Sequence, residues 1–243
     1  MTRFFVTPEE LQQDFVVLTG QNAAHAKVLR LQQGERVMIC DGNGKECYCT
    51  ISDVSSNQIS LVVESRIDSA SEAKIRASVY MAFSKGDKLE HVIQKATELG
   101  AYEIVAFPSA RCVSRPDEKS LAKKLERWKK IAASAAEQSG RGYVPEVIAL
   151  KSFSEAIKRG TEADKAILFY ENERATTLRM ALESGAYKSI ALLTGPEGGL
   201  ETGEVLEASK AGFSICTLGR RILRCETAPL CALSAVMYEA GEF

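Results

Sequence analysis

The chain has 243 residues, 45% of them hydrophobic, which is enough for one large or two modest domains with a buried core. Its formal net charge is −1, which argues against non-specific nucleic-acid binding by the whole surface but permits a local basic patch. No run of about 18 apolar residues is present, and the N-terminus lacks the apolar core of a secretion signal, so we expect a cytoplasmic protein without membrane spans.

The first part of the chain, residues 1–70, has the pattern of a small β domain. Two strand-like runs flank "DGNGK", a hairpin turn signal, and a third run follows at residues 57–67. Before them, residues 21–35 predict a short helix. Several short strands with one helix are typical of a small β-barrel. The residues of the helix that we expect to face inward are Val28, Leu29 and Leu31.

A polar segment at residues 68–74 marks a domain boundary, and residues 74–243 alternate strands with helices. This alternation predicts an α/β domain with a parallel sheet. Ligands of such sheets bind beyond the carboxyl ends of the strands. We therefore expect three strand ends to lie near one another, at residues 169–173, 194–199 and 218–227.

The segment "TGPEGG", residues 194–199, combines glycines and a proline directly after an apolar strand. It is neither a Walker A loop nor a GxGxxG loop. A tight turn before the next helix would explain one glycine but not three. Glycines here would allow backbone groups to approach a flat ligand such as a purine.

The segment "LGRRILRCETAPL", residues 218–230, places two apolar residues between arginines. Ile222 and Leu223 could pack under a loop, or they could form an apolar wall for a ring. Thr227 is the expected N-cap of the following helix. Arg224 and Glu226 could form a structural ion pair or act on a ligand, and both alternatives stay open here.

No metal site is expected. The seven cysteines contain no CxxC pair, and the chain has only two histidines. Cys47 and Cys49 share one face of a predicted strand, but no second pair accompanies them. Buried free thiols are the better interpretation.

The two late segments together resemble the RsmE-type 16S ribosomal RNA uracil-N3 methyltransferases, which belong to the SPOUT superfamily of knotted methyltransferases. Further similarity lies in "HAKVLRLQQGE", "KGDKLEHVIQKATELG", "RCV" and "WKKIAASAAEQSGR", so the resemblance covers nearly the whole chain. Arg220 departs from the pattern, because many relatives carry proline there.

The resemblance implies a PUA-like N-terminal barrel that binds RNA and a C-terminal α/β domain with a deep trefoil knot, an exception to the rule that chains avoid threading. It also implies S-adenosylmethionine as cofactor, a homodimer with shared active sites, and 16S ribosomal RNA or the small ribosomal subunit as partner. The cofactor contacts that it implies are Phe169, Tyr170, Leu193, Thr194, Gly195, Glu197, Gly198, Gly199, Leu218, Gly219, Ile222, Leu223 and Arg224.

For the chemistry, Arg224 is the catalytic candidate, as a cation that stabilises the uracil oxygens while the N3 proton leaves. Glu197 and Glu226 are weaker candidates for a base, because helix N-termini and arginine neighbours lower carboxyl pKa values. The alternatives are a knotted methyltransferase for another base or ribose, and a non-catalytic RNA-binding assembly factor. The basic stretch at residues 111–143 and the N-terminal domain supply the RNA-binding candidates, which are Arg3, Arg30, Arg111, Gln138 and Arg141.

Overall fold

The computed structural model describes residues 1–183 and 186–243 and divides into two compact units. The first unit comprises Met1–Glu72 and Ala136–Val144, and the second comprises Ala73–Ala135 and Pro145–Phe243. The assignment of residues 136–144 to the N-terminal unit was not predicted, because in the sequence they continue a helical pattern. Across the described ranges, none of the helices has both the length and the apolar character needed to cross a membrane.

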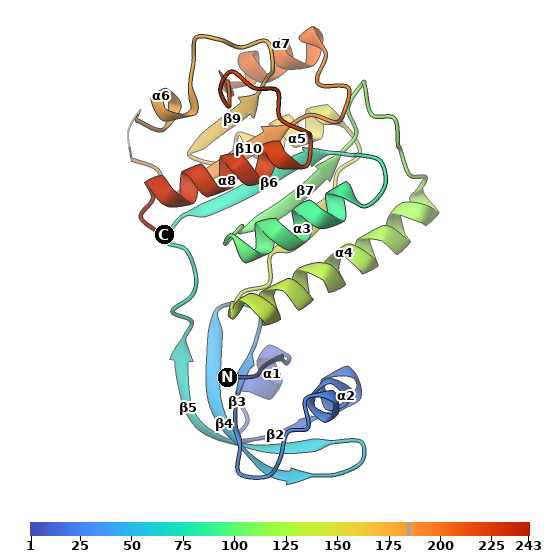
Figure 1. Ribbon diagram of the computed structural model, residues 1–243, viewed down its shortest axis with the longest axis vertical. Helices are drawn as coiled ribbons and strands as arrows, with labels where there is room; N and C mark the ends of the chain where they lie inside the picture. Colours follow the sequence, from blue (N-terminus) through green and yellow to red (C-terminus); the bar gives the residue numbers. More distant parts are fainter. Residues whose placement is uncertain (184–185) are drawn as a thin grey trace. The chain divides into compact units, whose positions relative to one another are not determined.

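The first unit is built on a curled five-stranded sheet with the strand order β1-β3-β4-β5-β2 (Figure 1). β1 pairs with β3 in parallel, and the other pairs are antiparallel. The sheet encloses an apolar core that includes the thiols of Cys47 and Cys49, as expected for buried cysteines. Its elements are β1 (Arg3–Phe5), α1 (Pro8–Leu11), β2 (Phe15–Leu18), α2 (Gly20–Val28), β3 (Arg36–Cys40), β4 (Lys45–Val54) and β5 (Ile59–Asp68).

The predicted hairpin between β3 and β4 is confirmed. Asp41 Oδ1 accepts hydrogen bonds from the backbone N–H groups of Asn43, at 2.7 Å, and Lys45, at 3.0 Å. Gly42 and Gly44 have φ angles of 74° and 93°, which side chains other than glycine rarely adopt. The turn residues therefore fix the register of the two strands.

The inward face predicted for α2 is wrong. Val28 is 79% exposed and Leu29 is 45% exposed, whereas the buried residues of the helix are Ala23 and Ala26. The helix ends at Val28, and the chain turns away through Arg30, whose φ of 57° is left-handed. Of the three predicted residues, Leu31 alone packs against the core, from beyond this turn.

The second unit is a six-stranded parallel sheet with the order β11-β9-β10-β6-β7-β8, which confirms the predicted α/β alternation. The short strand β8, of four residues, and the helix α5 were not predicted. The elements are β6 (Arg76–Ala82), α3 (Lys88–Glu98), β7 (Glu103–Phe107), α4 (Glu118–Ser139), β8 (Glu146–Ala149), α5 (Phe153–Gly160), β9 (Lys165–Phe169), α6 (Leu178–Glu183), β10 (Ser189–Thr194), α7 (Thr202–Ala211), β11 (Ser214–Cys216) and α8 (Thr227–Glu239).

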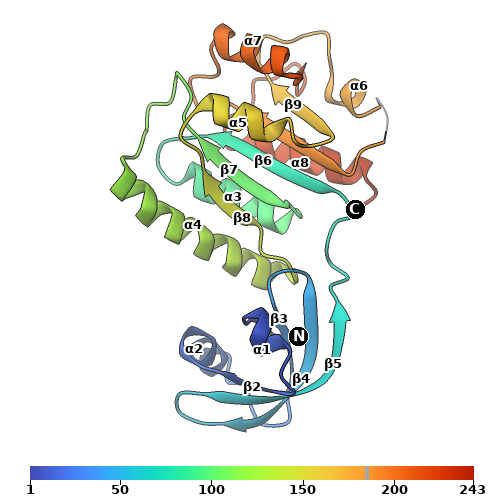
Figure 2. The same ribbon diagram turned by 180° about the vertical axis from the view of Figure 1, so that it is seen from behind.

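Helices cover both faces of this sheet. α3 and α8 contact each other, and α8 also contacts β6 and β10, while α5 and α7 lie on the opposite face, seen from behind in Figure 2. Val92 and Ile93 of α3 and Leu233 and Val236 of α8 are fully buried, as the periodicity of α3 predicted. Burial on both faces explains the continuous apolar runs of the central strands. The trefoil knot stays a prediction, since strand order alone does not establish threading.

Candidate active site

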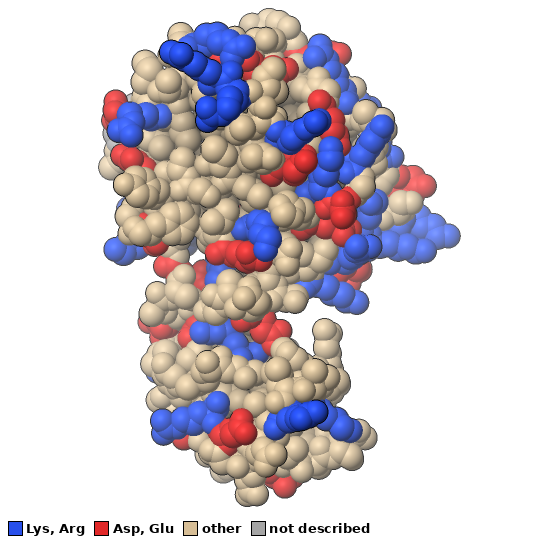
Figure 3. Space-filling view, viewed as in Figure 1, with Lys and Arg blue, Asp and Glu red and all other residues tan. Residues whose placement is uncertain are grey.

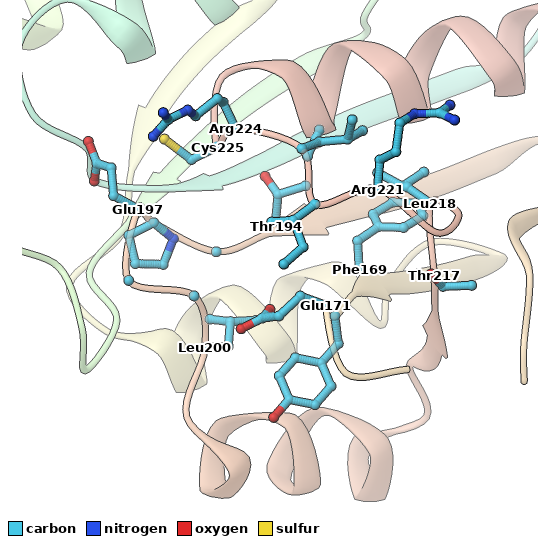
Figure 4. Close-up of a pocket in the computed structure, with 18 of the residues that line it drawn as sticks. Phe169, Glu171, Thr194, Glu197, Leu200, Thr217, Leu218, Arg221, Arg224 and Cys225 are labelled. Carbon is cyan, nitrogen blue, oxygen red and sulfur yellow. The ribbon is translucent and has the colours of Figure 1, made fainter. Parts of the chain in front are cut away.

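A pocket of about 510 Å³ opens where β9, β10 and β11 end. Its walls come from the segments after these strands, together with the start of α8 and Lys88 at the start of α3. Figure 4 shows Phe169, Thr194 and Leu218 around this space, with Glu197 and Arg224 toward one end. The three strand ends that the sequence placed near one another therefore line one pocket, of a volume usual for small-molecule sites.

The loop after β10 is a tight turn whose glycines accommodate protein neighbours. The N–H of Gly199 donates to the carbonyl of Pro196 at 2.9 Å, and Gly199 has a φ of 70°. A Cβ at Gly199 would overlap the Glu171 carboxylate, and one at Gly198 would lie 3.1 Å from Cβ of Arg111. From the sequence we expected the glycines to make room for a ligand. At Gly198 and Gly199 the space beside the backbone is instead occupied by the side chains of Arg111 and Glu171.

The loop between β11 and α8 turns through Gly219, whose φ is 107° and whose N–H donates to Oγ1 of Thr217 at 3.2 Å. In this loop the residue Ile222 projects into solvent and is 79% exposed. An apolar side chain at a pocket edge offers a wall for an apolar ring. The predicted cap of α8 is off by one residue, since Glu226 is the N-cap and Thr227 is the first helical residue.

Lys88 contacts carboxylates from both loops. Its Nζ lies 3.0 Å from Oε1 of Glu197 and 3.8 Å from Oε2 of Glu226. Oε1 of Glu197 also accepts the N–H of Lys85 at 2.9 Å. Next to these groups, Sγ of Cys225 donates to Oε2 of Glu226 at 3.2 Å.

These contacts shift the pKa values of the acidic groups. Burial opposes ionisation of Glu197, but hydrogen bonds from the N–H of Lys85, its own N–H and Lys88 outweigh it and lower its pKa. A hydrogen bond from its own N–H is the main cause of the lowered pKa of Glu226. Burial raises the pKa of the Cys225 thiol to about 12. At neutral pH the two carboxylates are therefore charged and the thiol is protonated.

In the loop before α8, the exposed cations that line the pocket are Arg221 and Arg224. Among the residues that the structure describes, no ion pair engages either side chain. Figure 4 shows the two guanidinium groups pointing away from each other, with Arg224 on the side of Glu197. The alternative of an ion pair between Arg224 and Glu226 is not realised in this structure, which leaves Arg224 available to a ligand.

Most of the expected cofactor residues line the pocket, and Leu193 is the exception. Its side chain is fully buried in the core on the α5 and α7 side of the sheet, beneath the site. The residues that do line it are Phe169, Tyr170, Thr194, Gly195, Glu197, Gly198, Gly199, Leu218, Gly219, Ile222, Leu223 and Arg224.

The expected RNA-binding residues divide into three groups. Arg3 is mostly buried against Glu46, and Arg141 is 4% exposed with its guanidinium on Glu72, so both stabilise the first unit. Arg30 and Gln138 are exposed in that unit. Arg111 lies in the second unit, where its Nη1 donates to the carbonyl of Gly198 at 3.2 Å beside the pocket loop.

Several lining residues were not predicted. Glu171 lies in the strand end predicted at residues 169–173, and Arg174 follows it directly. Their charged side chains could have been proposed as ligand contacts, but no role was assigned to them. Lys88 gave no signal, because it precedes the other pocket residues by about 80 positions and looks like any surface lysine of a helix. The remaining ones are Pro196, Leu200, Thr217, Arg221, Cys225 and Ala228.

Comparison with known proteins agrees with this geometry. Residues 71–237 match an RNA methyltransferase domain family and residues 18–64 match an RNA methyltransferase PUA domain family. The chain is 37% identical to ribosomal RNA small subunit methyltransferase E of Bacillus subtilis, over 98% of this chain and 97% of that one. It is 32% identical to the protein of the same name from Synechocystis, over 96% and 76% of the two chains.

Among solved structures, a ribosomal RNA small subunit methyltransferase E from Neisseria gonorrhoeae, bound to S-adenosyl methionine, matches with a TM-score of 0.86. The two chains are 31% identical, and the match covers 98% of each. These similarities confirm the resemblance found in the sequence and extend it over the whole fold. The chain belongs to the ribosomal RNA small subunit methyltransferase E family.

Proposed function

We propose that this protein transfers a methyl group from S-adenosylmethionine to N3 of a uridine in 16S ribosomal RNA. The observation that carries the proposal is the pocket formed by three strand-end loops in a chain that is similar, end to end, to a relative bound to this donor. The PUA domain match supports RNA as the substrate class.

The residues present fit the donor. Leu218, Ile222 and Leu223 offer apolar walls for an adenine ring, and the exposed Ile222 lies at the pocket edge, where a ring can pack against it. Gly219 has open space where a Cβ would lie, so ligand atoms can approach its backbone closely. The Glu171 carboxylate can accept hydrogen bonds from ribose hydroxyls. The bound donor would supply an electrophilic methyl group on a sulfonium.

Arg224 is the catalytic residue that we propose. Uracil N3 must lose its proton to become nucleophilic, and the negative charge then spreads over the ring oxygens. An exposed, always charged guanidinium beside the pocket stabilises that charge. The base must also leave its stack to reach the pocket, as is usual when chemistry is performed on a base.

Glu197 and Glu226 are poor candidates for the base, as the sequence interpretation held. Their pKa values are lowered, so both carboxylates are stable in the charged form and accept protons weakly at neutral pH. In the described ranges, no histidine lines the pocket. We therefore propose that the proton leaves to water while Arg224 stabilises the anion.

RNA binding is assigned to exposed polar groups in each unit. In the first unit, the residues that we propose to bind RNA are Arg30 and Gln138. In the second unit, the corresponding residue is Arg111. Figure 3 shows basic side chains gathered over α4, where Lys119, Lys123, Lys129 and Lys130 are exposed, and over the loop before α8. We leave Arg3 and Arg141 out of this surface, because burial and the ion pairs with Glu46 and Glu72 occupy them.

The family also supports a homodimer, a trefoil knot and a cytoplasmic location, which we include in the proposal. Within the described residues, none of the His, Cys, Asp and Glu clusters could hold a metal ion. Several large apolar side chains of the second unit are exposed to solvent, and a partner subunit would cover those that lie at its interface. These exposed side chains include Val113, Leu206, Tyr238 and Phe243.

Methyl transfer from labelled donor to small ribosomal subunits, naked 16S RNA and transfer RNA, followed by mass spectrometry of the nucleosides, tests the function. We expect 3-methyluridine from the ribosomal substrates alone. Another methylated nucleoside would move the protein to a different acceptor. Donor binding without turnover on any RNA would favour an assembly factor instead.

A further inference from the structure

We propose that Lys88 is a positioning residue that joins the two loops of the pocket and thereby sets the affinity for the methyl donor. This inference rests on the proposed function and adds a residue from a third segment of the chain. Its Nζ bonds Glu197 from the loop after β10 and approaches Glu226 at the start of α8. The same ammonium lies 3.9 Å from Sγ of Cys225.

The position of Lys88 is unfavourable for a plain surface lysine. It is the first residue of α3, where the helix dipole disfavours a cation and acidic residues are preferred. Its side chain is 31% exposed, and those of Glu197 and Glu226 are 23% and 29% exposed. The ammonium is thus partly shielded from solvent beside two anions, and its charge offsets part of theirs.

Without the ammonium, the charged carboxylates of Glu197 and Glu226 would lose the cation that lies within 4 Å of each of them. Like charges at this end of the pocket would then repel each other, which favours separation of the two loops. The hydrogen bond from Lys85 would keep Glu197 in place, so Glu226 and the start of α8 would shift. That shift would displace Arg224, Leu223 and Ile222, which precede Glu226 by two to four positions and line the pocket.

The effect should be read most directly in donor binding. Lys88 lines the pocket, whereas Arg30 and Gln138, which we assign to RNA, belong to the first unit. We therefore expect Lys88→Met to raise the dissociation constant for the donor and the KM for the donor by about 10-fold. The thermal unfolding midpoint should stay close to that of the unchanged protein, and kcat should fall together with donor affinity, because Arg224 lies on the displaced loop.

Lys95→Met is a matched control. Lys95 lies on the same helix, is 39% exposed and pairs with Glu98 at 2.8 Å, but it does not line the pocket. Lys88→Arg should restore most of the affinity, since it keeps the charge and the reach. Lys88→Gln is a second neutral variant should the methionine variant fail to fold.

Isothermal titration calorimetry with S-adenosylmethionine, on the full chain without RNA, gives a readout independent of turnover. A 10-fold loss for Lys88→Met and Lys88→Gln, with Lys95→Met unchanged and Lys88→Arg restored, supports the proposal. Equal affinity of Lys88→Met and the unchanged protein overturns it, as does an equal loss in Lys95→Met or a failure of Lys88→Arg to restore binding. If the unchanged protein itself gives no heat, the proposed function fails first.

Discussion

Replacing Gly199 with alanine perturbs the pocket at its most constrained point. The φ of 70° costs a residue with a Cβ about 1–2 kcal/mol in the left-handed region. The added methyl group would also overlap the Glu171 carboxylate, which must then move. For a chain of this size, each kcal/mol lowers the unfolding midpoint by about 2–4 °C. We therefore expect Gly199→Ala to lower the midpoint by about 2–8 °C and to weaken donor binding.

Thermal unfolding and calorimetric titration of the donor measure these two effects, and Gly203→Ala is the control. Gly203 lies in α7 with open space where the added methyl group would lie, so alanine there should raise the midpoint slightly. In the double variant Gly199→Ala with Glu171→Ala, the decrease in unfolding midpoint that comes from the overlap should disappear. The decrease that comes from the left-handed backbone should remain. If Gly199→Ala has the same unfolding midpoint and the same donor affinity as the unchanged protein, the strained turn does not support the pocket and the reasoning is refuted.

Three further outcomes are expected. Arg224→Ala should abolish methyl transfer while the unfolding midpoint stays unchanged, and turnover at the original rate in that variant would remove Arg224 from the mechanism. Arg30→Ala should weaken RNA binding and lower the slope of log affinity against log salt by about one, whereas an unchanged slope would show that Arg30 meets no phosphate. Hydrogen bonds from the backbone N–H groups of Thr176, Ala175 and Arg174 lower the pKa of Glu173 below its reference value of 4.5. This carboxylate therefore stabilises the fold above about pH 4.5, and the contribution is lost as the pH falls through the lowered pKa. Glu173→Gln should lower the unfolding midpoint at pH 7, and its difference from the unchanged protein should shrink below about pH 4.5; a constant difference across that range would contradict the assignment.

The parallel sheet and its ligand edge could be predicted from sequence because the signals are local. Apolar strands alternating with helices specify the layers, and the carboxyl ends of parallel strands meet by geometry. The glycine-rich turn at residues 195–199 and the apolar pair Ile222-Leu223 could be placed at that edge in this way. What the turn packs against was not visible, because Glu171 and Arg111 approach it from distant parts of the chain.

Charged side chains were harder to place than apolar ones. Arg141 looked like an RNA ligand, but a buried pairing with Glu72 determines its place. Lys88 looked like a solvated lysine and instead contacts two pocket loops. An arginine or lysine can pair with any acid in reach, so its role depends on tertiary contacts that sequence spacing does not encode. Apolar residues can mislead in the same way. Val28 was expected in the core because it is apolar, but it is the last residue of α2 and is exposed, while Ala23 and Ala26 face the core.

A crystal structure of this protein with S-adenosylmethionine tests the central claim most directly. We predict electron density for the adenosine between residues 194–199 and 218–223, with Glu171 at the ribose and Lys88 still bonded to Glu197. Density at another place on the chain, or loops that separate when the donor binds, would contradict the account.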